Sequence, residues 1–531
     1  MEKILLLQLN RLGDLVQTVP LLRQLRSEYP DSEITLVCQL GIQEIVADCG
    51  YFDRLVALSK RTVDGLSDRT SFVAFDQHPE FRETYDLAIN LASDLGAAIL
   101  TEKIAAKRKQ GRIHTHDGEI RLLGLWAKYL FAMVTNRLDN LFNIVDIQAG
   151  IAGLQPAPQP NSLPVSAARA AEAVSLLDSN GRKGGRRLIA FQTGASQLHR
   201  AWALENFAEL SCRLLENDYA EIVLVGDAGE RERAENLQSL VPFPLLNLVG
   251  KTSLVQLPAI LAECDLLVSN DTGTIHIAAA VATPTLGLFF STAYFSETAP
   301  YGAGHAILQV EIPCAPCHAS AVCPVQICRQ YLPPEAVYET TRWLLDGSES
   351  PTPRPNLSLY LSRFLANGSM IYLPVHPEVS KHYFAGLIGR QLWEGVLGLE
   401  RDRHQEEIWN RIRHNQDWEK NKTTLAATFE SLATTFSIGL NLASKLRSEL
   451  EGATPIRARI VILHRQLSEL GATMANLARD GGLFGDFLKY EMMDLDYAPY
   501  PEIARNLEAK YQKLSEWTRG FRDVLVRLSG P

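Results

Sequence analysis

The sequence predicts an α/β fold of two Rossmann-like domains followed by an all-helical region. Short apolar runs alternate with helical patterns over two separate stretches of the chain. A proline-rich segment, residues 155–164, lies between these stretches and is typical of a domain linker. From about residue 350, apolar residues recur at helical spacing instead. We therefore expect domains at residues 1–165, 166–348 and 349–531.

Each α/β stretch has its own series of elements. In the first we expect strands at residues 4–9, 34–38 and 87–91, with a helix at 15–29. In the second we expect a helix at 254–263 and strands at residues 188–192, 221–225, 245–248, 266–269 and 285–289. Alternation of this kind is typical of βαβ units in parallel sheets. Two such halves joined by a linker favour a ligand cleft between them.

The C-terminal region shows three helical patterns. They cover residues 425–440, 460–477 and 503–528, and residues 451–455 separate the first two. The second pattern steps by three and four residues, like a heptad seam. We expect a three-helix bundle, with an intermolecular coiled coil, and hence a homo-oligomer, as the alternative.

The composition limits the class of protein and its partners. The 531 residues are 46% hydrophobic and 21% charged, as in soluble globular proteins. A net charge of −9 gives no global attraction to nucleic acid, so we expect no nucleic-acid partner. No apolar stretch approaches the ~18 residues that span a bilayer. We expect a cytoplasmic protein.

The most informative motif is Ser269-Asn-Asp-Thr-Gly-Thr-Ile-His276, which predicts a strand, a tight loop and a helix start. Asp271 and Thr272 can cap this helix, and Gly273 allows a ligand to approach the backbone. The unpaired N–H groups at a helix start can bind phosphate. The alternative is an ordinary turn with no ligand.

Two further loops follow predicted strands. In the first, Gly13 and Asp14 stand at the start of a helix, where Asp14 can be an N-cap or a general base facing a cleft. In the loop at 192–202, Thr193, Gly194 and Ser196 suit a phosphate-binding turn, and Arg200 adds a permanent cation. The alternative for this second loop is a solvated turn.

These motifs together resemble glycosyltransferase family nine, the ADP-heptose:lipopolysaccharide heptosyltransferases. The resemblance covers roughly residues 1–345 and also includes residues 85–91, 105–108, 226–230 and 248–254. It implies a GT-B fold and an inverting transfer from a nucleotide-activated heptose that needs no metal. The sequence agrees, because it offers no Asp-x-Asp pair suited to holding a metal on a diphosphate.

The resemblance also implies roles for individual residues. Asp14 takes the position of the general base, and Arg200 stands where the family usually has lysine. The donor-binding residues it implies are Thr193, Gly194, Ser196, Glu230, Asp271, Thr272, Gly273 and His276. Basic residues of the first domain face the acidic acceptor in this family, so we expect Lys107, Arg108 and Arg112 to bind it. The alternative for this basic run is a solvated helix face.

Four cysteines lie close together in the sequence. Cys314, Cys317, Cys323 and Cys328 stand within fifteen residues, with His318 among them. Thiolates at this density can bind zinc or iron tetrahedrally. We expect a structural metal here, with redox-sensitive or free thiols as the alternative.

Three functions remain open from the sequence. The first is transfer of heptose from ADP-heptose to the lipopolysaccharide core, by a protein that is peripheral on the inner face of the inner membrane. The second is a protein heptosyltransferase whose helical region recruits the acceptor or forms oligomers. The third is a non-catalytic GT-B-like scaffold that binds nucleotides, against which the presence of Asp14 argues.

Overall fold

The protein is described from a computed structural model. It describes residues 2–66, 77–115, 118–134, 136–216, 219–317, 323, 325–376, 381–399, 418–451, 462–463, 465–467 and 500–528. The chain divides into two compact units, residues 1–119 with 142–380 and residues 120–141 with 381–531. Among the helices of the described ranges, none is both long and apolar enough to cross a membrane.

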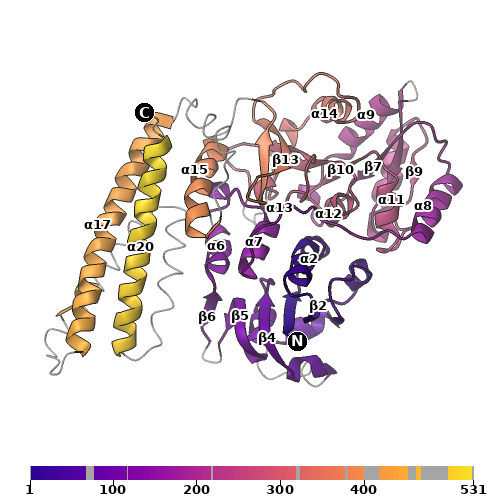
Figure 1. Cartoon of the computed structure of the whole chain (residues 1–531). Coiled ribbons are helices and arrows are strands. Elements are labelled where there is room, and N and C mark those ends of the chain that lie inside the picture. The colour runs from indigo at the N-terminus through magenta and orange to yellow at the C-terminus, as the bar shows by residue number, and fades with distance from the viewer. Residues whose placement is uncertain are drawn as a thin grey trace. The chain divides into compact units, whose positions relative to one another are not determined.

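The first unit holds two sheets (Figure 1). In the first sheet, parallel strands run in the order β3-β2-β1-β4-β5. Their bounds are β1 Lys3–Gln8, β2 Glu33–Gln39, β3 Arg54–Leu58, β4 Thr84–Asn90 and β5 Ala105–His114. The helices that follow them are α1 Leu12–Val16, α2 Val19–Glu28, α3 Lys60–Leu66, α5 Leu95–Lys103 and α7 Ile144–Ile151. The three predicted strands are present, and β3 and β5 were not predicted.

The helix predicted at residues 15–29 is two helices, α1 and α2. The break falls at Gln17 and Thr18, just before Val19 and Pro20 open α2. Proline has no backbone N–H to donate, so it suits the first turn of a new helix better than the interior of a long one.

The second sheet has the order β14-β13-β12-β11-β10-β7-β8-β9. Its parallel strands are β7 Arg187–Gln192, β8 Ala220–Leu224, β9 Leu246–Asn247, β10 Leu266–Asn270, β11 Thr285–Phe289 and β12 Ala306–Val310. The associated helices are α8 Ala167–Ser179, α9 Leu204–Leu215, α10 Arg231–Leu240, α11 Leu257–Ala262, α12 Gly273–Ala280, α13 Phe295–Thr298 and α14 Pro334–Asp346. The strands predicted in this stretch are present.

Two antiparallel strands complete the second sheet. β13 (Leu357–Phe364) pairs with β12, and β14 (Met370–Pro374) pairs with β13. We had expected helices from residue 349, so this part of the chain differs from the prediction. The signal was local: alternating apolar residues flank Asn367-Gly368, a dipeptide typical of hairpin turns.

Each sheet has one topological switch point, where the strand order reverses. In the first sheet the order reverses between β1 and β4, and in the second between β7 and β10. Loops at the carboxyl ends of strands diverge at such points and leave a crevice. The loops after β1, β7 and β10, which carry Asp14, Arg200 and Asp271, leave the sheets there.

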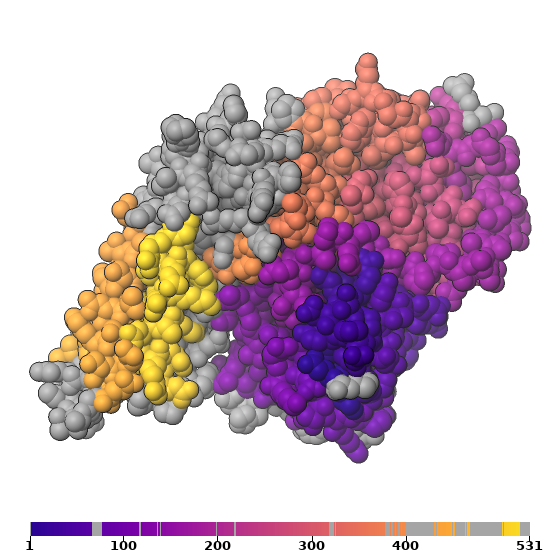
Figure 2. Space-filling view, in the orientation of Figure 1, coloured from indigo at the N-terminus to yellow at the C-terminus, as the bar shows by residue number. Residues whose placement is uncertain are grey.

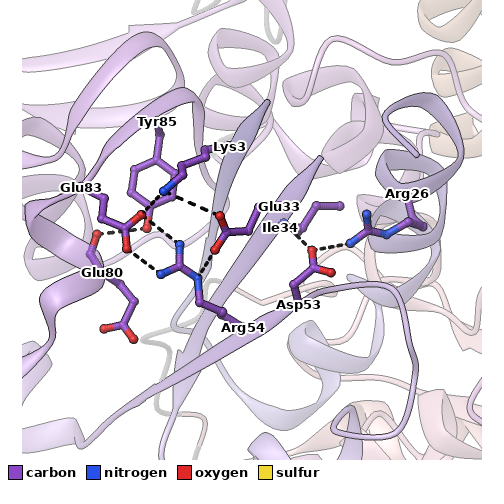
Figure 3. A network of polar contacts seen from close by, with 9 residues as sticks. All are labelled: Lys3, Arg26, Glu33, Ile34, Asp53, Arg54, Glu80, Glu83 and Tyr85. Carbon is purple, nitrogen blue, oxygen red and sulfur yellow. Dashed lines mark hydrogen bonds and ion pairs between the residues drawn. The ribbon is translucent and has the colours of Figure 1, made fainter. Parts of the chain in front are cut away.

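An ion-pair network lies at the amino end of the first sheet, opposite the loops described above (Figure 3). Glu83 accepts hydrogen bonds from Lys3 Nζ at 2.5 Å and from Arg54 Nη1 at 2.6 Å. Arg54 Nε also lies 2.6 Å from Glu33 Oε1. These partners hold the pKa of Glu83 down, at about 2.

The second unit consists of β6 Ile120–Leu123, α6 Leu125–Met133, η3 Arg137–Asp139, α15 Lys381–Val396, α17 Trp418–Glu451 and α20 Tyr500–Leu528. α17 and α20 lie side by side (Figures 1 and 2). Gly439 of α17 makes room for the Tyr511 ring of α20, since a Cβ there would lie 2.2 Å from it. The helix predicted within residues 460–477 lies almost entirely outside the described residues.

Residues 120–141 belong to this second unit, although we had placed them in the first domain. Tyr129 of α6 packs edge-on against Trp393 of α15, with ring centroids 5.1 Å apart. Arg390 of α15 is buried, donates to the Leu141 carbonyl at 2.6 Å and pairs with Glu394 at 3.3 Å. The contacts of Trp393 with Tyr129 and of Arg390 with Leu141 join segments about 250 positions apart, which no local pattern reveals.

Candidate functional site

A cavity of about 1200 Å³ lies in the first unit, at the carboxyl ends of strands from both sheets. Its wall on the first-sheet side includes Asn10, Gly13, Asp14, Gln17, Ser93 and Asp94. Its wall on the second-sheet side includes Gln192, Ser196, Arg200, Glu230, Asp271, Thr272, Gly273 and His276. Residues from the two predicted domains therefore meet around one cavity.

Asp14 lies in the first turn of α1 and lines this cavity. Its Oδ2 accepts the backbone N–H of Arg11 at 3.1 Å, so the side chain also stabilises the helix start. Burial raises the pKa of Asp14, and the negative charge of Asp271 raises it further, whereas Arg11 opposes the rise. A carboxylate with a raised pKa that faces a cavity is a candidate general base.

Arg200 and Asp271 form an ion pair on the second-sheet side. Arg200 Nη2 lies 2.5 Å from Asp271 Oδ2, and the two side chains are only 17% and 13% exposed. Thr298 donates a weaker hydrogen bond to the other Asp271 oxygen at 3.4 Å. We expect Arg200 to hold a donor diphosphate; in the structure it pairs with a neighbouring carboxylate.

Two glycines let α1 and α12 approach closely. A Cβ on Gly13 would lie 2.9 Å from Cδ2 of His276, and one on Gly273 would lie 3.2 Å from Cδ2 of Leu12. His276 is buried, and burial lowers its pKa to about 4, so its imidazole is neutral at neutral pH. The turn that carries Asp14 thus rests on the helix that begins at Gly273.

Thr193 and Gly194, which we expect to contact the donor, are buried and are not among the residues that line the cavity. Their carbonyl groups accept from Asn270 Nδ2 at 3.1 and 2.9 Å. Asn270 Oδ1 in turn accepts the backbone N–H of Trp202 at 2.9 Å. Asn270 therefore fixes the loop after β7 against the loop after β10 from a buried position.

Glu230 stands between the loops after β7 and β8. Its two oxygens accept from Gln192 Nε2 at 3.2 and 3.0 Å. A Cβ on Gly194 or on Gly226 would lie 1.5 or 2.1 Å from these oxygens, so a larger residue at either position would displace the Glu230 carboxylate. Burial raises the pKa of Glu230, and the Gln192 hydrogen bond opposes the rise.

The three predicted acceptor-binding residues all lie on β5, a strand and not a helix, and the structure separates them. Lys107 is paired with Asp86 at 2.7 Å near the amino end of the sheet, with its side chain 75% exposed. Arg108 is exposed on the same strand. Arg112 lies at the carboxyl end, where Nη1 donates to the Ser93 carbonyl beside the cavity.

Residues on the first-sheet side of the cavity were missed from the sequence. Asn10 Oδ1 accepts the Ser93 N–H at 3.2 Å and so ties the loop after β1 to the loop after β4. Asp94 caps α5 by accepting the Ala97 N–H at 2.7 Å, and burial raises its pKa. These residues could have been found from their position in the sequence, because each follows the end of a buried strand.

The cysteine cluster does not form a metal centre in the described part of the chain, where no group of three or more histidine, cysteine, aspartate or glutamate residues could hold a metal ion. The zinc or iron prediction is therefore not supported. Cys317 Sγ donates to the Cys314 carbonyl, and Cys323 Sγ accepts the Gln326 N–H, each at 3.2 Å. Cys328 is buried and free. His318 lies outside the described residues.

Comparison with known families decides the class of protein. A family model described as glycosyltransferase family 9 (heptosyltransferase) matches residues 80–325. This part of the chain belongs to glycosyltransferase family 9. This member of the family is therefore an enzyme that transfers a sugar, and the resemblance inferred from the motifs is confirmed.

Relatives of this glycosyltransferase cover more than half of it. Lipopolysaccharide heptosyltransferase 3 of Escherichia coli is 23% identical over 294 residues, 53% of this chain and 80% of that protein. Lipopolysaccharide core heptosyltransferase OpsX of Haemophilus influenzae is 25% identical over 312 residues, 56% and 82% of the two chains. A solved family 9 glycosyltransferase from Veillonella parvula matches with a TM-score of 0.52 at 22% identity, over 65% of this chain and 98% of that one. The predicted GT-B fold is confirmed.

Proposed function

We propose that this enzyme transfers a heptose from ADP-heptose to a sugar hydroxyl of the lipopolysaccharide core, with inversion at the anomeric carbon. The observation that carries the proposal is a single cavity lined by Asp14 on one side and by the start of α12 on the other. The names of the relatives support the sugar and the acceptor class.

On the acceptor side, Asp14 is the proposed general base. Its raised pKa makes it a better proton acceptor than an exposed aspartate. It takes the proton of the acceptor hydroxyl as that oxygen attacks the anomeric carbon. Direct attack from the face opposite the diphosphate gives inversion.

On the donor side, the departing diphosphate is stabilised by the start of α12. Thr272 is the N-cap of this helix and Gly273 is its first residue, so unpaired N–H groups are available there. Arg200 and Glu230 line the same cavity, and we assign Glu230 to the hydroxyl groups of the nucleoside. These groups are from the protein itself, so the proposal assigns no step to a metal.

The proposed acceptor is carried by a membrane lipid. We therefore place the reaction at the cytoplasmic face of the inner membrane, with the enzyme as a peripheral protein. Membrane fractions should retain part of the enzyme at low salt and release it at high salt.

Donor binding tests the proposal first. We expect calorimetry to show micromolar binding of ADP-heptose and weaker binding of ADP, with little binding of UDP or GDP. Transfer is then measured with heptose-deficient core oligosaccharides and with protein acceptors in parallel. Tighter binding of another nucleotide contradicts the proposed donor, transfer to protein alone contradicts the proposed acceptor, and binding without any transfer supports a scaffold.

A further inference from the structure

The ion pair between Arg200 and Asp271 lies close to the proposed base, although it belongs to the other side of the cavity. Arg200 ends the short helix η4 (Leu198–Arg200), and Asp271 stands between β10 and α12. Their 2.5 Å contact is largely shielded from solvent, so it is only weakly screened by water. Both residues line the same cavity as Asp14.

The backbone brings Asp271 near Asp14. α1 packs on α12, and a Cβ on Gly273 would lie only 3.4 Å from the backbone N of Gly13. Gly13 directly precedes Asp14, and Gly273 follows Asp271 by two positions. The two carboxylates therefore belong to turns that are in contact.

We propose that Arg200 acts on the base through Asp271: by pairing with Asp271, it neutralises a negative charge that otherwise opposes the ionised form of Asp14. The inference rests on the proposed role of Asp14. Arg200 is then a positioning residue, because it acts on Asp14 only through the charge of Asp271. It is also a proposed contact of the diphosphate. The direction of the effect agrees with the structure, since Asp271 raises the pKa of Asp14.

The other groups around Asp14 do not replace this effect. Arg11, on the same turn, favours the ionised form, and His276 from α12 is neutral. The remaining charged residues that line the cavity on the first-sheet side are Lys60 and Asp64 of α3 and Asp94 before α5. Asp271, on the second-sheet side, carries the negative charge that Arg200 neutralises.

The guanidinium of Arg200 has nitrogens besides the one that contacts Asp271. Nη2 engages Asp271, and Nη1 lies 3.4 Å from Ser196 Oγ. In the described part of the chain, the buried Nε has no hydrogen-bond partner. The planar group thus holds the Asp271 carboxylate with one nitrogen and contacts the loop after β7 with another.

The test is the ionisation of Asp14 in variants of the full chain. Arg200→Gln removes the cation that faces Asp271, so the pKa of Asp14 should rise by about one pH unit. Asp271→Asn removes the negative charge, so the pKa should fall by about the same amount. The double variant Arg200→Gln/Asp271→Asn should return close to wild type, and Arg200→Lys, which keeps the charge, should stay close to it.

Two measurements report this ionisation. One is the acid limb of the pH profile of kcat/KM for transfer from ADP-heptose, which should move to higher pH in Arg200→Gln and to lower pH in Asp271→Asn. The other is titration of the ¹³C-labelled carboxyl of Asp14 by NMR, assigned by comparison with Asp14→Asn, which needs no turnover.

The outcomes separate this inference from the proposed function. Opposite shifts in the two single variants support the inference, because loss of structure would not move them in opposite directions. Equal or absent shifts in the ¹³C titration overturn it. A wild-type enzyme that transfers no sugar contradicts the proposed function instead, and the titration still decides the charge relation.

Discussion

The two ends of the first sheet use charged residues in opposite ways. At the amino end, Glu83 is held by two cations, and its pKa is lowered to about 2 (Figure 3). At the carboxyl end, Asp14 and Asp94 line a cavity, and burial raises the pKa of both. The same strands, β1 and β4, connect the two ends.

The difference shows which carboxylates stabilise the fold and which are available for chemistry. A paired carboxylate prefers its charged form in the folded state and so stabilises that state. A buried carboxylate with a raised pKa is less stable when ionised, and such groups concentrate at functional sites. Substitutions at the two ends should therefore separate activity from stability.

Asp14→Asn should have the largest effect on activity. Loss of the base should lower kcat by about 10²- to 10⁴-fold. Donor affinity should stay unchanged, and Tm should not fall, because a buried ionised group is replaced by a neutral one. Steady-state kinetics, calorimetry with ADP-heptose and thermal melts check these three points. Wild-type kcat in the variant would refute the assignment of the base.

Gly13→Ala should have the next largest effect. The new Cβ would lie 2.9 Å from the His276 ring, and such overpacking costs about 1–3 kcal/mol. We expect kcat/KM to fall by about tenfold as the Asp14 turn is displaced, which corresponds to 1.4 kcal/mol. Gly520→Ala is the control, since no atom lies within 4 Å of that Cβ and the helix α20 should gain about 0.5–1 kcal/mol.

Glu83→Gln should lower stability and leave transfer unchanged. Loss of the ionic contacts to Lys3 and Arg54 should reduce the free energy of unfolding by about 1 kcal/mol at neutral pH. Because the folded pKa is depressed, this contribution is complete above the ordinary value of 4.5 and is lost as the pH falls towards 2. Urea titrations of both proteins across this range check the prediction. A constant difference down to pH 2 would contradict it.

Arg112→Ala and Lys107→Ala should show the smallest effects and test the predicted acceptor contacts. Arg112 lies beside Ser93 at the cavity end of β5, so its loss should raise the acceptor KM by about fivefold, or roughly 1 kcal/mol. Lys107 lies near the other end and should leave KM unchanged. An equal rise of the acceptor KM in both variants would indicate that the acceptor site extends along the whole of β5.

Much of the fold was readable from local patterns. Apolar runs in the sequence predict the buried strands β1, β2, β4, β7, β8, β10 and β11. β5 was missed because its basic residues resemble a solvated helix face, and its register against β4 is what makes it a strand. β13 and β14 were missed although their alternation and the turn at Asn367-Gly368 were visible.

The sequence by itself determined the two parallel sheets and the loops that carry Asp14, Glu230 and Asp271. Apolar periodicity and strand-end motifs are local properties of the sequence, so they can be recognised without knowing how the strands pack. Only the tertiary structure decided that Arg200 pairs with Asp271, 71 positions away, and that His276 lies beneath Gly13. Such contacts depend on how separate loops approach one another, and no local spacing encodes that distance.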